Sequence, residues 1–337
     1  MKPSFAQFLA LIGWIVVAAL GVLSNANAMD VAVATGQPDE PCKYPESIFQ
    51  GYEPTTLGYT KQSDDEWFLN FTISFKAPLF RSLLCDHLGG RGHLYLTFTG
   101  SFAFYVATRH SGPVLGREYN PKLLWRFIPD PHDTRTASSF DRQAVLVYAS
   151  YIDFAYAHSS NGQSIDTKQE FDIEANQLGS ARDALDYVSR GWDYLQVVGK
   201  KTVSAAHGRE LVFYPDFKFF LRHGLLQGAP EEWHPWEVDT ALRPRHAFDG
   251  VSAAVEYWPY KGQPAQSLQS SVRFQIRYTT GYDPIARYNT FRGEFGFSPW
   301  GLPLAMWAED GYMYGLARYY KKTSAVGVEL RFATIDY

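Results

Sequence analysis

The sequence has little cysteine, and it has no long apolar run beyond its first residues. Cys42 and Cys85 are the only two cysteines among 337 residues, and the formal net charge is only -4. No apolar run after the N-terminal one reaches the roughly 18 residues that a transmembrane helix needs. The mature chain is therefore expected to have no helical span. Its charge gives no reason to expect nucleic acid as a partner.

The first 28 residues have the pattern of a signal peptide. Lys2 precedes an apolar run from Phe8 to Leu23, and Ala26-Asn27-Ala28 forms a small-residue cleavage site. This pattern favours a cleaved signal peptide at 1–28 over an uncleaved N-terminal anchor helix. In an exported chain Cys42 and Cys85 can form one disulfide or remain two free thiols. Residues 29–51 contain Pro and Asp without periodicity, which predicts an irregular periplasmic segment.

Alternation of apolar and polar residues dominates residues 52–337. Val272, Phe274, Ile276 and Tyr278, for example, alternate with Arg273, Gln275 and Arg277. A period of two places these two sets on opposite faces of a strand. The same pattern predicts strands near 55–61, 66–76, 92–106, 121–129, 144–158, 192–198, 209–222, 247–258, 271–279, 288–297, 302–308 and 323–332.

These segments predict an all-β, twelve-stranded antiparallel transmembrane β-barrel over 52–337. An even strand number is expected of a bacterial barrel. The alternative, a soluble β-sandwich, does not explain aromatic-rich faces on nearly every strand of an exported chain whose aromatic content is 16%. With both chain ends in the periplasm, the fifth strand ends outside and 163–190 is a long outer loop. Cys42 and Cys85 then lie on the same, periplasmic side.

His158 and Ser160 lie at the outer end of the fifth predicted strand. Their spacing of two places both side chains on its apolar face, which meets lipid in a membrane barrel. A serine hydroxyl becomes nucleophilic when a base takes its proton, and a third group must orient the imidazole. The candidates for that third group are Asp166, Asp172 and Asp193. Asp193 begins the next strand with the parity of apolar Leu195 and Val197, so it is expected to face the same side as His158.

The run from His158 to Ser164, His-Ser-Ser-Asn-Gly-Gln-Ser, resembles the H-x-S-N-G-[RQ]-S signature of outer-membrane phospholipase A. Residues 75–80, 117–121 and 189–193 resemble further segments of that family along most of the mature chain. The resemblance implies a calcium-dependent, dimeric, twelve-stranded barrel. It also implies that Ser160 is the nucleophile, that His158 is the base, and that the backbone N–H of Gly162 contributes to the oxyanion hole.

The resemblance leaves two positions for the third member of the triad. The family's orienting residue is usually asparagine, and the flanking segment Ser-Arg-Gly-Trp-Asp places Asp193 there. The family's usual spacing of 14 residues from the histidine points instead to Asp172. We follow the flanking segment, because a loop insertion changes spacing easily. The resemblance also implies one calcium ion per active site, with ligands at Gln163, Ser189 and, by a looser match, Ser111.

The hypothesis from the sequence is an outer-membrane serine hydrolase of a Gram-negative bacterium. It would release fatty acids from membrane phospholipid, with phospholipase A1, phospholipase A2 and lysophospholipase activity, and act as a homodimer. One alternative is a catalytically silent barrel that serves as a pore or structural protein, although a lumen crowded with charged side chains favours a plugged barrel. Another is a phospholipid acyltransferase, which would use the same triad.

Overall fold

The structure is a computed structural model of the 337-residue chain, and the described residues belong to one compact unit, Tyr44–Tyr337. It describes residues 49–64, 66–79, 92–106, 114–129, 134–138, 144–148, 150–205, 209–232, 234, 236–237, 243–259, 272–298, 302–313 and 315–331. The predicted signal peptide, all but the last three residues of the predicted irregular segment, and the predicted calcium ligand Ser111 lie outside these ranges. The two cysteines do as well.

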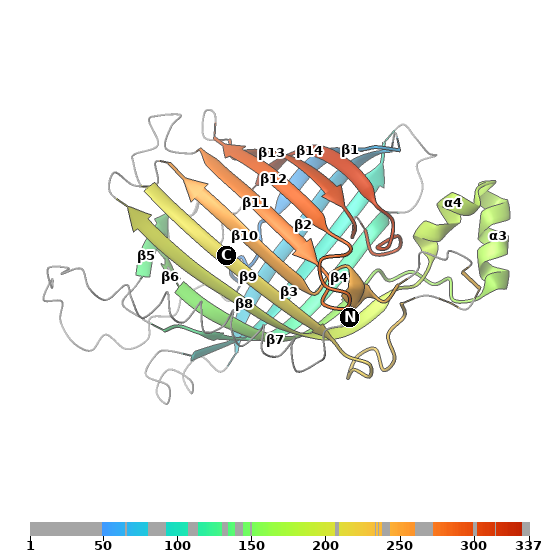
Figure 1. Ribbon diagram of the computed structural model, residues 1–337, viewed down its shortest axis with the longest axis horizontal. Coiled ribbons are helices and arrows are strands. Elements are labelled where there is room, and N and C mark those ends of the chain that lie inside the picture. Colours follow the sequence, from blue (N-terminus) through green and yellow to red (C-terminus); the bar gives the residue numbers. More distant parts are fainter. Residues whose placement is uncertain are drawn as a thin grey trace, which may run out of the picture. The chain divides into compact units, whose positions relative to one another are not determined.

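Twelve antiparallel strands close into a barrel, which confirms the predicted fold class (Figure 1). Each barrel strand pairs with its neighbours along the chain, except that β4 pairs with β7 across an inserted hairpin, and β1 pairs with β14 to close the sheet. The barrel strands are β1 (Thr56–Gln62), β2 (Trp67–Leu79), β3 (Gly92–Tyr105), β4 (Leu115–Phe127), β7 (Ser150–Ser160), β8 (Gly191–Ala205), β9 (Arg209–Phe220), β10 (Val251–Trp258), β11 (Arg273–Thr280), β12 (Thr290–Phe297), β13 (Leu304–Gly311) and β14 (Thr323–Arg331).

Side-chain alternation gives the barrel an apolar outer face and a polar lumen. On β11 the outward Ile276 is 66% exposed, whereas the inward Arg273 and Gln275 are buried. The outward Phe291 of β12 and Val326 of β14 are exposed in the same way. Exposed apolar residues on successive strands form a continuous apolar wall, as expected where a barrel faces lipid.

Ion pairs cross the lumen between inward-facing charged residues. Arg273 of β11 contacts Glu256 of β10 at 3.1 Å and also pairs with Glu294 of β12. Arg331 of β14 pairs with Glu294 and, at 2.7 Å, with Glu329. A buried carboxylate is stable only when its lost hydration is replaced by charged or hydrogen-bonding partners. Paired charged side chains therefore occupy part of the lumen.

The predicted strand 144–158 is two separate strands, so its predicted start is wrong. Residues Ala144–Tyr148 form β6, which pairs with β5 (Thr134–Ser138) in a two-stranded sheet apart from the barrel. The barrel strand β7 begins at Ser150. Leu146 and Tyr148 therefore do not belong to the barrel wall that carries His158. Among the other strands, β4 begins earlier than predicted and β8 ends later.

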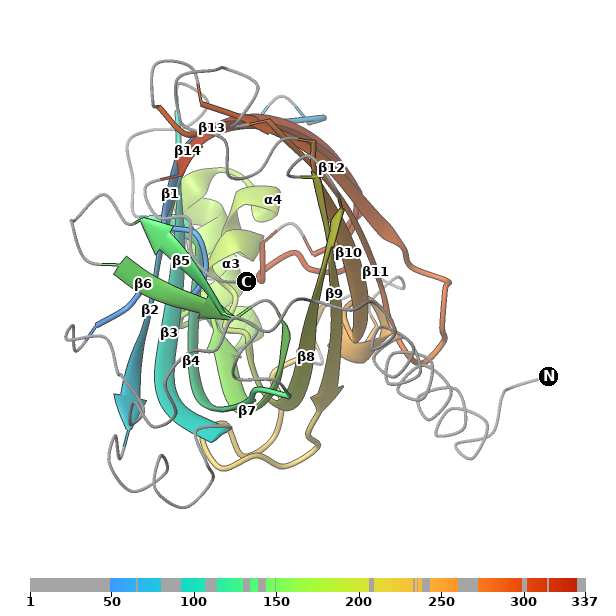
Figure 2. The same cartoon turned by 90° about the vertical axis from the view of Figure 1, so that its left-hand side faces the viewer.

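The segment between β7 and β8 contains helices where the sequence predicted only a long polar loop. Helix α3 (Lys168–Leu178) begins at a capping box in which Thr167 and Glu170 bond each other's backbone N–H, and it ends at left-handed Gly179. Helix α4 (Ala181–Ala184) and the 3-10 helix η2 (Leu185–Tyr187) follow. Among the described residues, no helix is long and apolar enough to cross a membrane. Figures 1 and 2 place α3 and α4 beyond one end of the barrel.

An aromatic cluster lies near the start of β8, at the end of the barrel closest to α3 and α4 (Figure 1). Trp192 and Tyr194 of β8 pack with Phe248, which follows the 3-10 helix η4 (Arg245–Ala247), and with Tyr319 from the segment between β13 and β14. The hydroxyl of Tyr319 donates to the backbone carbonyl of Glu232 at 3.1 Å. The connections β9–β10 and β13–β14 are therefore both fixed against the end of β8, where the candidate site lies.

Candidate active site

His158 and Asp193 lie directly opposite each other on the adjacent strands β7 and β8. The Nδ1 atom of His158 is 2.7 Å from the Oδ1 atom of Asp193, and their side chains are 15% and 1% exposed. The pairing follows from strand parity, because both residues share the outward face with exposed neighbours, Phe154 on β7 and Leu195 on β8. A buried carboxylate on Nδ1 fixes the ring orientation and leaves Nε2 as the nitrogen that can take a proton.

Ser160 lies two residues beyond His158 on the same outward face, at the last position of β7. It pairs in register with Gly191 on one side and with Tyr119 of β4 on the other. Gly162 then turns the chain with a left-handed backbone, at a φ of 58°. A Cβ atom at Gly162 would lie 2.9 Å from the Tyr119 ring, so both the backbone conformation and the close ring favour glycine there.

A buried polar network supports β7 from the lumen side. Ser159, between the two candidate catalytic residues, donates to Glu118 at 2.9 Å and accepts from Arg245 at 3.0 Å. Arg245 also pairs with Asp249 at 3.1 Å. Asn120 donates to the backbone carbonyl of His158 at 3.0 Å. These bonds hold the strand that presents His158 and Ser160 to the outside.

Asn161 joins the chain after Ser160 to the chain before β8. Its Oδ1 atom accepts from the backbone N–H of Arg190 at 2.9 Å and of Gln163 at 3.3 Å, and its Nδ2 atom donates to the carbonyl of Val188 at 2.8 Å. The side chain thereby uses its acceptor for two backbone donors in a buried position. It also brings the backbone of Gln163 close to the segment that contains Ser189. Both residues are predicted calcium ligands.

Ser189 and Gln163 differ in whether their side chains could contribute an oxygen to a bound cation. The hydroxyl of Ser189 donates to Glu231 at 2.6 Å, so a hydroxyl oxygen and a carboxylate lie together there. Such oxygens suit a hard cation such as Ca²⁺. The side-chain oxygen of Gln163 instead accepts from the guanidinium of Arg117 at 2.9 Å. The Ser189 hydroxyl and the Glu231 carboxylate are therefore oxygen donors of the kind that calcium prefers, whereas the Gln163 amide oxygen already accepts from a positive group. The other Glu231 oxygen accepts from the side-chain N–H of Gln227 at 2.7 Å.

The segment around Ser189 and Glu231 has two more properties that bear on cation binding. Within the described ranges, no cluster of three or more His, Cys, Asp or Glu residues has the arrangement of a metal site. Next to Glu231 in sequence, burial raises the pKa of Glu232 to about 7. The charge of the loop beside Ser189 therefore changes near neutral pH.

The alternative third residues lie elsewhere. Asp172 is on the exposed helix α3, where its half-exposed carboxylate pairs with Lys168 one turn earlier. Asp166 precedes α3, and its backbone carbonyl accepts from the indole N–H of Trp236 at 2.9 Å. Of the three aspartates, Asp193 is the one that the structure brings to His158.

Sequence reasoning missed four residues that contact the site: Tyr156, Leu226, Gln227 and Glu231. The hydroxyl of Tyr156 donates to Asp193, and the backbone N–H groups of Leu226 and Gln227 do so at 2.7 and 3.1 Å. Tyr156 had a usable signal, since it shares the face of His158 two residues earlier. The other three come from the segment after β9, and no local pattern connects them to β7 or β8.

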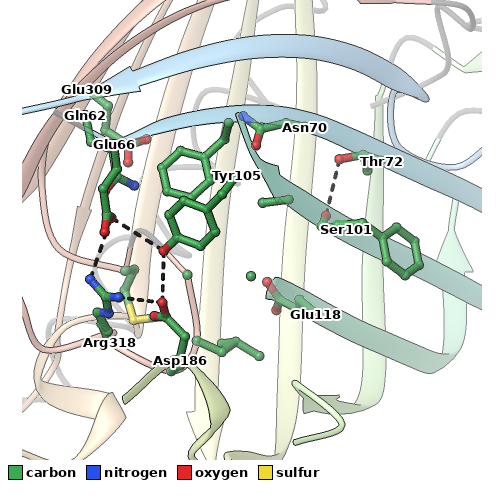
Figure 3. Close-up of a pocket in the computed structure, with 18 of the residues that line it drawn as sticks. Gln62, Glu66, Asn70, Thr72, Ser101, Tyr105, Glu118, Asp186, Glu309 and Arg318 are labelled. Atoms are coloured by element: carbon green, nitrogen blue, oxygen red, sulfur yellow. Dashed lines mark hydrogen bonds and ion pairs between the residues drawn. The ribbon is translucent and has the colours of Figure 1, made fainter. Parts of the chain in front are cut away.

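Two cavities of the barrel are not lined by the candidate triad. One, of about 340 Å³, lies in the lumen and is lined by Glu118, Glu309 and other inward side chains. In it Arg318 bridges Glu66 and Asp186 (Figure 3). The other, of about 310 Å³, is lined by inward residues that include Lys122. The chemistry of His158 and Asp193 therefore faces the outer wall of the barrel and not its lumen.

The segment before β8 is anchored by a buried ion pair that offers a stability test. Arg190 makes two bonds with the carboxylate of Glu237, at 2.6 and 3.0 Å, and their side chains are 0% and 2% exposed. We expect Glu237→Ala to leave an unpaired guanidinium and to destabilise this region by about 3 kcal/mol. Hydrogen exchange of the amides at 187–191 should accelerate accordingly.

A double variant, Arg190→Leu with Glu237→Leu, is the matched control for this prediction. It removes both charges, so it should recover much of the lost protection. If Glu237→Ala exchanges at the wild-type rate, the ion pair does not anchor the segment.

Comparison with known proteins supports the fold and leaves the activity to be tested. No family model matches the sequence, and neither does any curated protein. Among solved structures, outer membrane phospholipase A from Escherichia coli is 15% identical over 86% of this chain and 100% of its own, with a TM-score of 0.54. The Salmonella typhi outer membrane phospholipase dimer with bound calcium is 16% identical over 86% and 94%, with a TM-score of 0.55. This likeness establishes the fold. At such identities it does not extend to the activity.

Proposed function

We propose that this protein is an outer-membrane serine hydrolase that releases fatty acids from phospholipids. The observation that carries the proposal is the direct bond between His158 and the buried carboxylate of Asp193, with Ser160 two residues farther along the same outward face. An outward site can meet a lipid in the outer leaflet without drawing it into the lumen. The distant structural likeness to outer membrane phospholipases agrees with this chemistry.

In the proposed reaction, the Oγ atom of Ser160 attacks the carbonyl carbon of an acyl ester while Nε2 of His158 takes the hydroxyl proton. Asp193 stabilises the imidazolium that forms. The oxyanion is stabilised by the backbone N–H of Gly162. His158 then returns the proton to the departing alcohol oxygen of the lysophospholipid. Water, activated by the same histidine, releases the fatty acid from Ser160.

Both ester positions of a diacyl phospholipid, and the remaining ester of a lysophospholipid, present the same carbonyl chemistry to Ser160. The proposal therefore includes phospholipase A1, phospholipase A2 and lysophospholipase activity. We also propose that the active form is a homodimer in the outer membrane of a Gram-negative bacterium. The exposed apolar residues near the site, including Phe154 and Leu195, supply a surface compatible with lipid or with a second barrel.

Calcium is the proposed cofactor, one ion per active site. Ser189 and Glu231 would hold it, and Gln163 would contribute through its backbone carbonyl because its side chain binds Arg117. When bound, calcium supplies Lewis-acid stabilisation of developing negative charge. Ser111 stays a proposed ligand, and it lies outside the described residues.

The calcium proposal gives a test on Glu231. We expect Glu231→Gln to weaken calcium binding about 10-fold or more, because it removes a charged oxygen donor beside Ser189. Titration calorimetry of the protein in detergent measures binding, and the calcium concentration for half-maximal fatty-acid release measures its effect. The matched control is Glu174→Gln on α3. Equal calcium affinity in Glu231→Gln and wild type would show that the ion does not use this carboxylate.

The central experiment measures fatty-acid release from mixed phospholipid and detergent micelles by the refolded mature chain. A fluorophosphonate probe added to the same preparation should label Ser160, which peptide mass spectrometry identifies. Release together with labelling supports the proposal. A folded barrel that neither releases fatty acid nor reacts at Ser160, with or without calcium, overturns it. Large stable conductance in planar bilayers would then favour the pore.

A further inference from the structure

The Asp193 carboxylate is enclosed by hydrogen-bond donors from one strand, β7, and one turn. Its Oδ1 atom bonds Nδ1 of His158, and its Oδ2 atom accepts from the backbone N–H groups of Leu226 and Gln227 and from the hydroxyl of Tyr156. The turn that contains these backbone donors, residues 224–227, belongs to the segment after β9. None of these donors except His158 is explained by the catalytic cycle proposed above.

The turn lies directly against the carboxylate. A Cβ atom at Gly224 would be 1.9 Å from Oδ2 and 2.3 Å from Cγ of Asp193, so no larger residue fits without displacing one of them. The turn is closed by a bond from the N–H of Gly224 to the carbonyl of Gly228 at 2.8 Å. It is tied to β8 by a bond from the N–H of Leu221 to the carbonyl of Asp193 at 2.9 Å.

Tyr156 connects the turn to the triad. Its hydroxyl donates to Asp193 and accepts from the backbone N–H of Leu225 at 2.6 Å. A tyrosine hydroxyl can act in both roles at once. Tyr156 is two residues before His158 on the same face of β7, so one strand supplies both the base and a bond that holds its partner.

The hydrogen-bond donors around position 193 favour a carboxylate side chain over an amide. An ionised carboxylate only accepts hydrogen bonds, and both of its oxygens meet donors here. The amide of an asparagine would direct an NH₂ group either at the imidazole or at the donors on the Oδ2 side. The Tyr156 hydroxyl can rotate to accept from that group, but the backbone N–H groups of Leu226 and Gln227 cannot. In that orientation two partly buried backbone donors would lose their acceptor. In the other orientation the NH₂ group would face Nδ1 of His158, so Nε2 would carry the proton and could not act as the base.

We propose that residues 224–227 and Tyr156 form a clamp that holds Asp193 as an acceptor-only carboxylate, so that the site requires aspartate and excludes its amide isostere. This inference rests on the proposed function and deepens it. It makes Tyr156 and Gly224 positioning residues, which act on the reaction through Asp193.

The clamp also lies at the surface. The side chains of Leu225 and Leu226 are 86% and 65% exposed, although their backbone N–H groups bond Tyr156 and Asp193. The same turn therefore binds the buried carboxylate with its backbone and presents apolar side chains outward. Its backbone, and not those side chains, performs the positioning.

The test compares Asp193→Asn with the wild type in the micelle assay. We expect kcat to fall about 100-fold or more with KM nearly unchanged, because substrate contacts are kept while the imidazole loses its charged partner. Fluorophosphonate labelling of Ser160 should slow in parallel. Gly224→Ala should reproduce this loss, and Tyr156→Phe should lower kcat about 10-fold through the loss of one bond.

Two matched controls make the outcome specific. Asp172→Asn makes the same chemical change at an exposed position, and Gly293→Ala adds a methyl group where nothing lies within 4 Å. Both should keep wild-type kcat. An active wild type with full kcat in Asp193→Asn overturns the clamp while the proposed function stands. If kcat falls in Asp193→Asn but stays at the wild-type value in both Gly224→Ala and Tyr156→Phe, the clamp is not the reason that the site requires aspartate. An inactive wild type overturns the proposed function itself.

Discussion

Fatty-acid release is expected to fall at least about 1,000-fold when Ser160 is replaced by alanine, because the proposed nucleophile, which would form the acyl-enzyme, is then lost. Ser160 ends β7 with its side chain on the same outward face as His158, and the change removes a single oxygen atom. The barrel fold should be unaffected. The measurement is single-turnover release from a labelled phospholipid in micelles, with folding checked by circular dichroism and gel mobility.

Ser164→Ala is the matched control, since Ser164 is an exposed serine four residues along the chain. It should keep wild-type activity. If Ser160→Ala and Ser164→Ala release fatty acid at the same rate, the hydrolysis does not use Ser160 and the proposed mechanism is wrong. Loss of covalent labelling in Ser160→Ala alone would identify the reactive oxygen.

The second large effect is expected from Asp193→Ala. Removal of the carboxylate should lower kcat about 100-fold to 10,000-fold, because the imidazole loses both its orientation and the charge that stabilises its protonated form. Asp172→Ala should leave kcat near wild type, since that side chain is half exposed and pairs with Lys168 on α3. Steady-state kinetics of the two variants, made side by side, decide between the two positions that the sequence left open.

The reverse pattern of activities in these two variants would also identify the third residue's position. A strong loss in Asp172→Ala with normal activity in Asp193→Ala would mean that the bond between His158 and Asp193 supports the strands and not the reaction. In that case the third residue would have to come from α3.

Residue alternation was sufficient to predict the barrel, because each wall strand has one apolar and one polar face. It could not separate β6 from β7. The alternation at Leu146 and Tyr148 continues in phase with Ile152 and Phe154, so a period of two is the same on both sides of the break. What distinguishes the two strands is their partner in space, β5 for one and β4 for the other. Pairing partners are not encoded in the periodicity of a single strand.

The helices after β7 could have been predicted more fully. Thr167 and Glu170 have the spacing of a capping box, and Gly179 lies where a helix of that length ends. Helix α3 buries none of its residues, so its sequence has no apolar stripe at helical spacing. Hydrophobic periodicity therefore did not predict it. Capping residues alone were the signal.

The pairing of His158 with Asp193 followed from parity on two strands, whereas the residues that enclose the pair did not. The contribution of Leu226 and Gln227 is made by backbone N–H groups, which every non-proline residue has. Glu231 reaches Ser189 across about forty residues of chain. Gly224 is the one residue of this segment whose identity reflects the contact, because it allows the backbone to approach the carboxylate.

The direct register of β7 on β8 links the proposed activity to assembly. His158 and Asp193 meet only when these two strands pair without a shift, since a slip of one residue turns one of the two side chains toward the lumen. A barrel closed in the wrong register would therefore lack the dyad even if every residue were present. For a protein proposed to hydrolyse membrane lipid, a chain whose strands have not yet joined in this register lacks the dyad and does not attack membrane lipid.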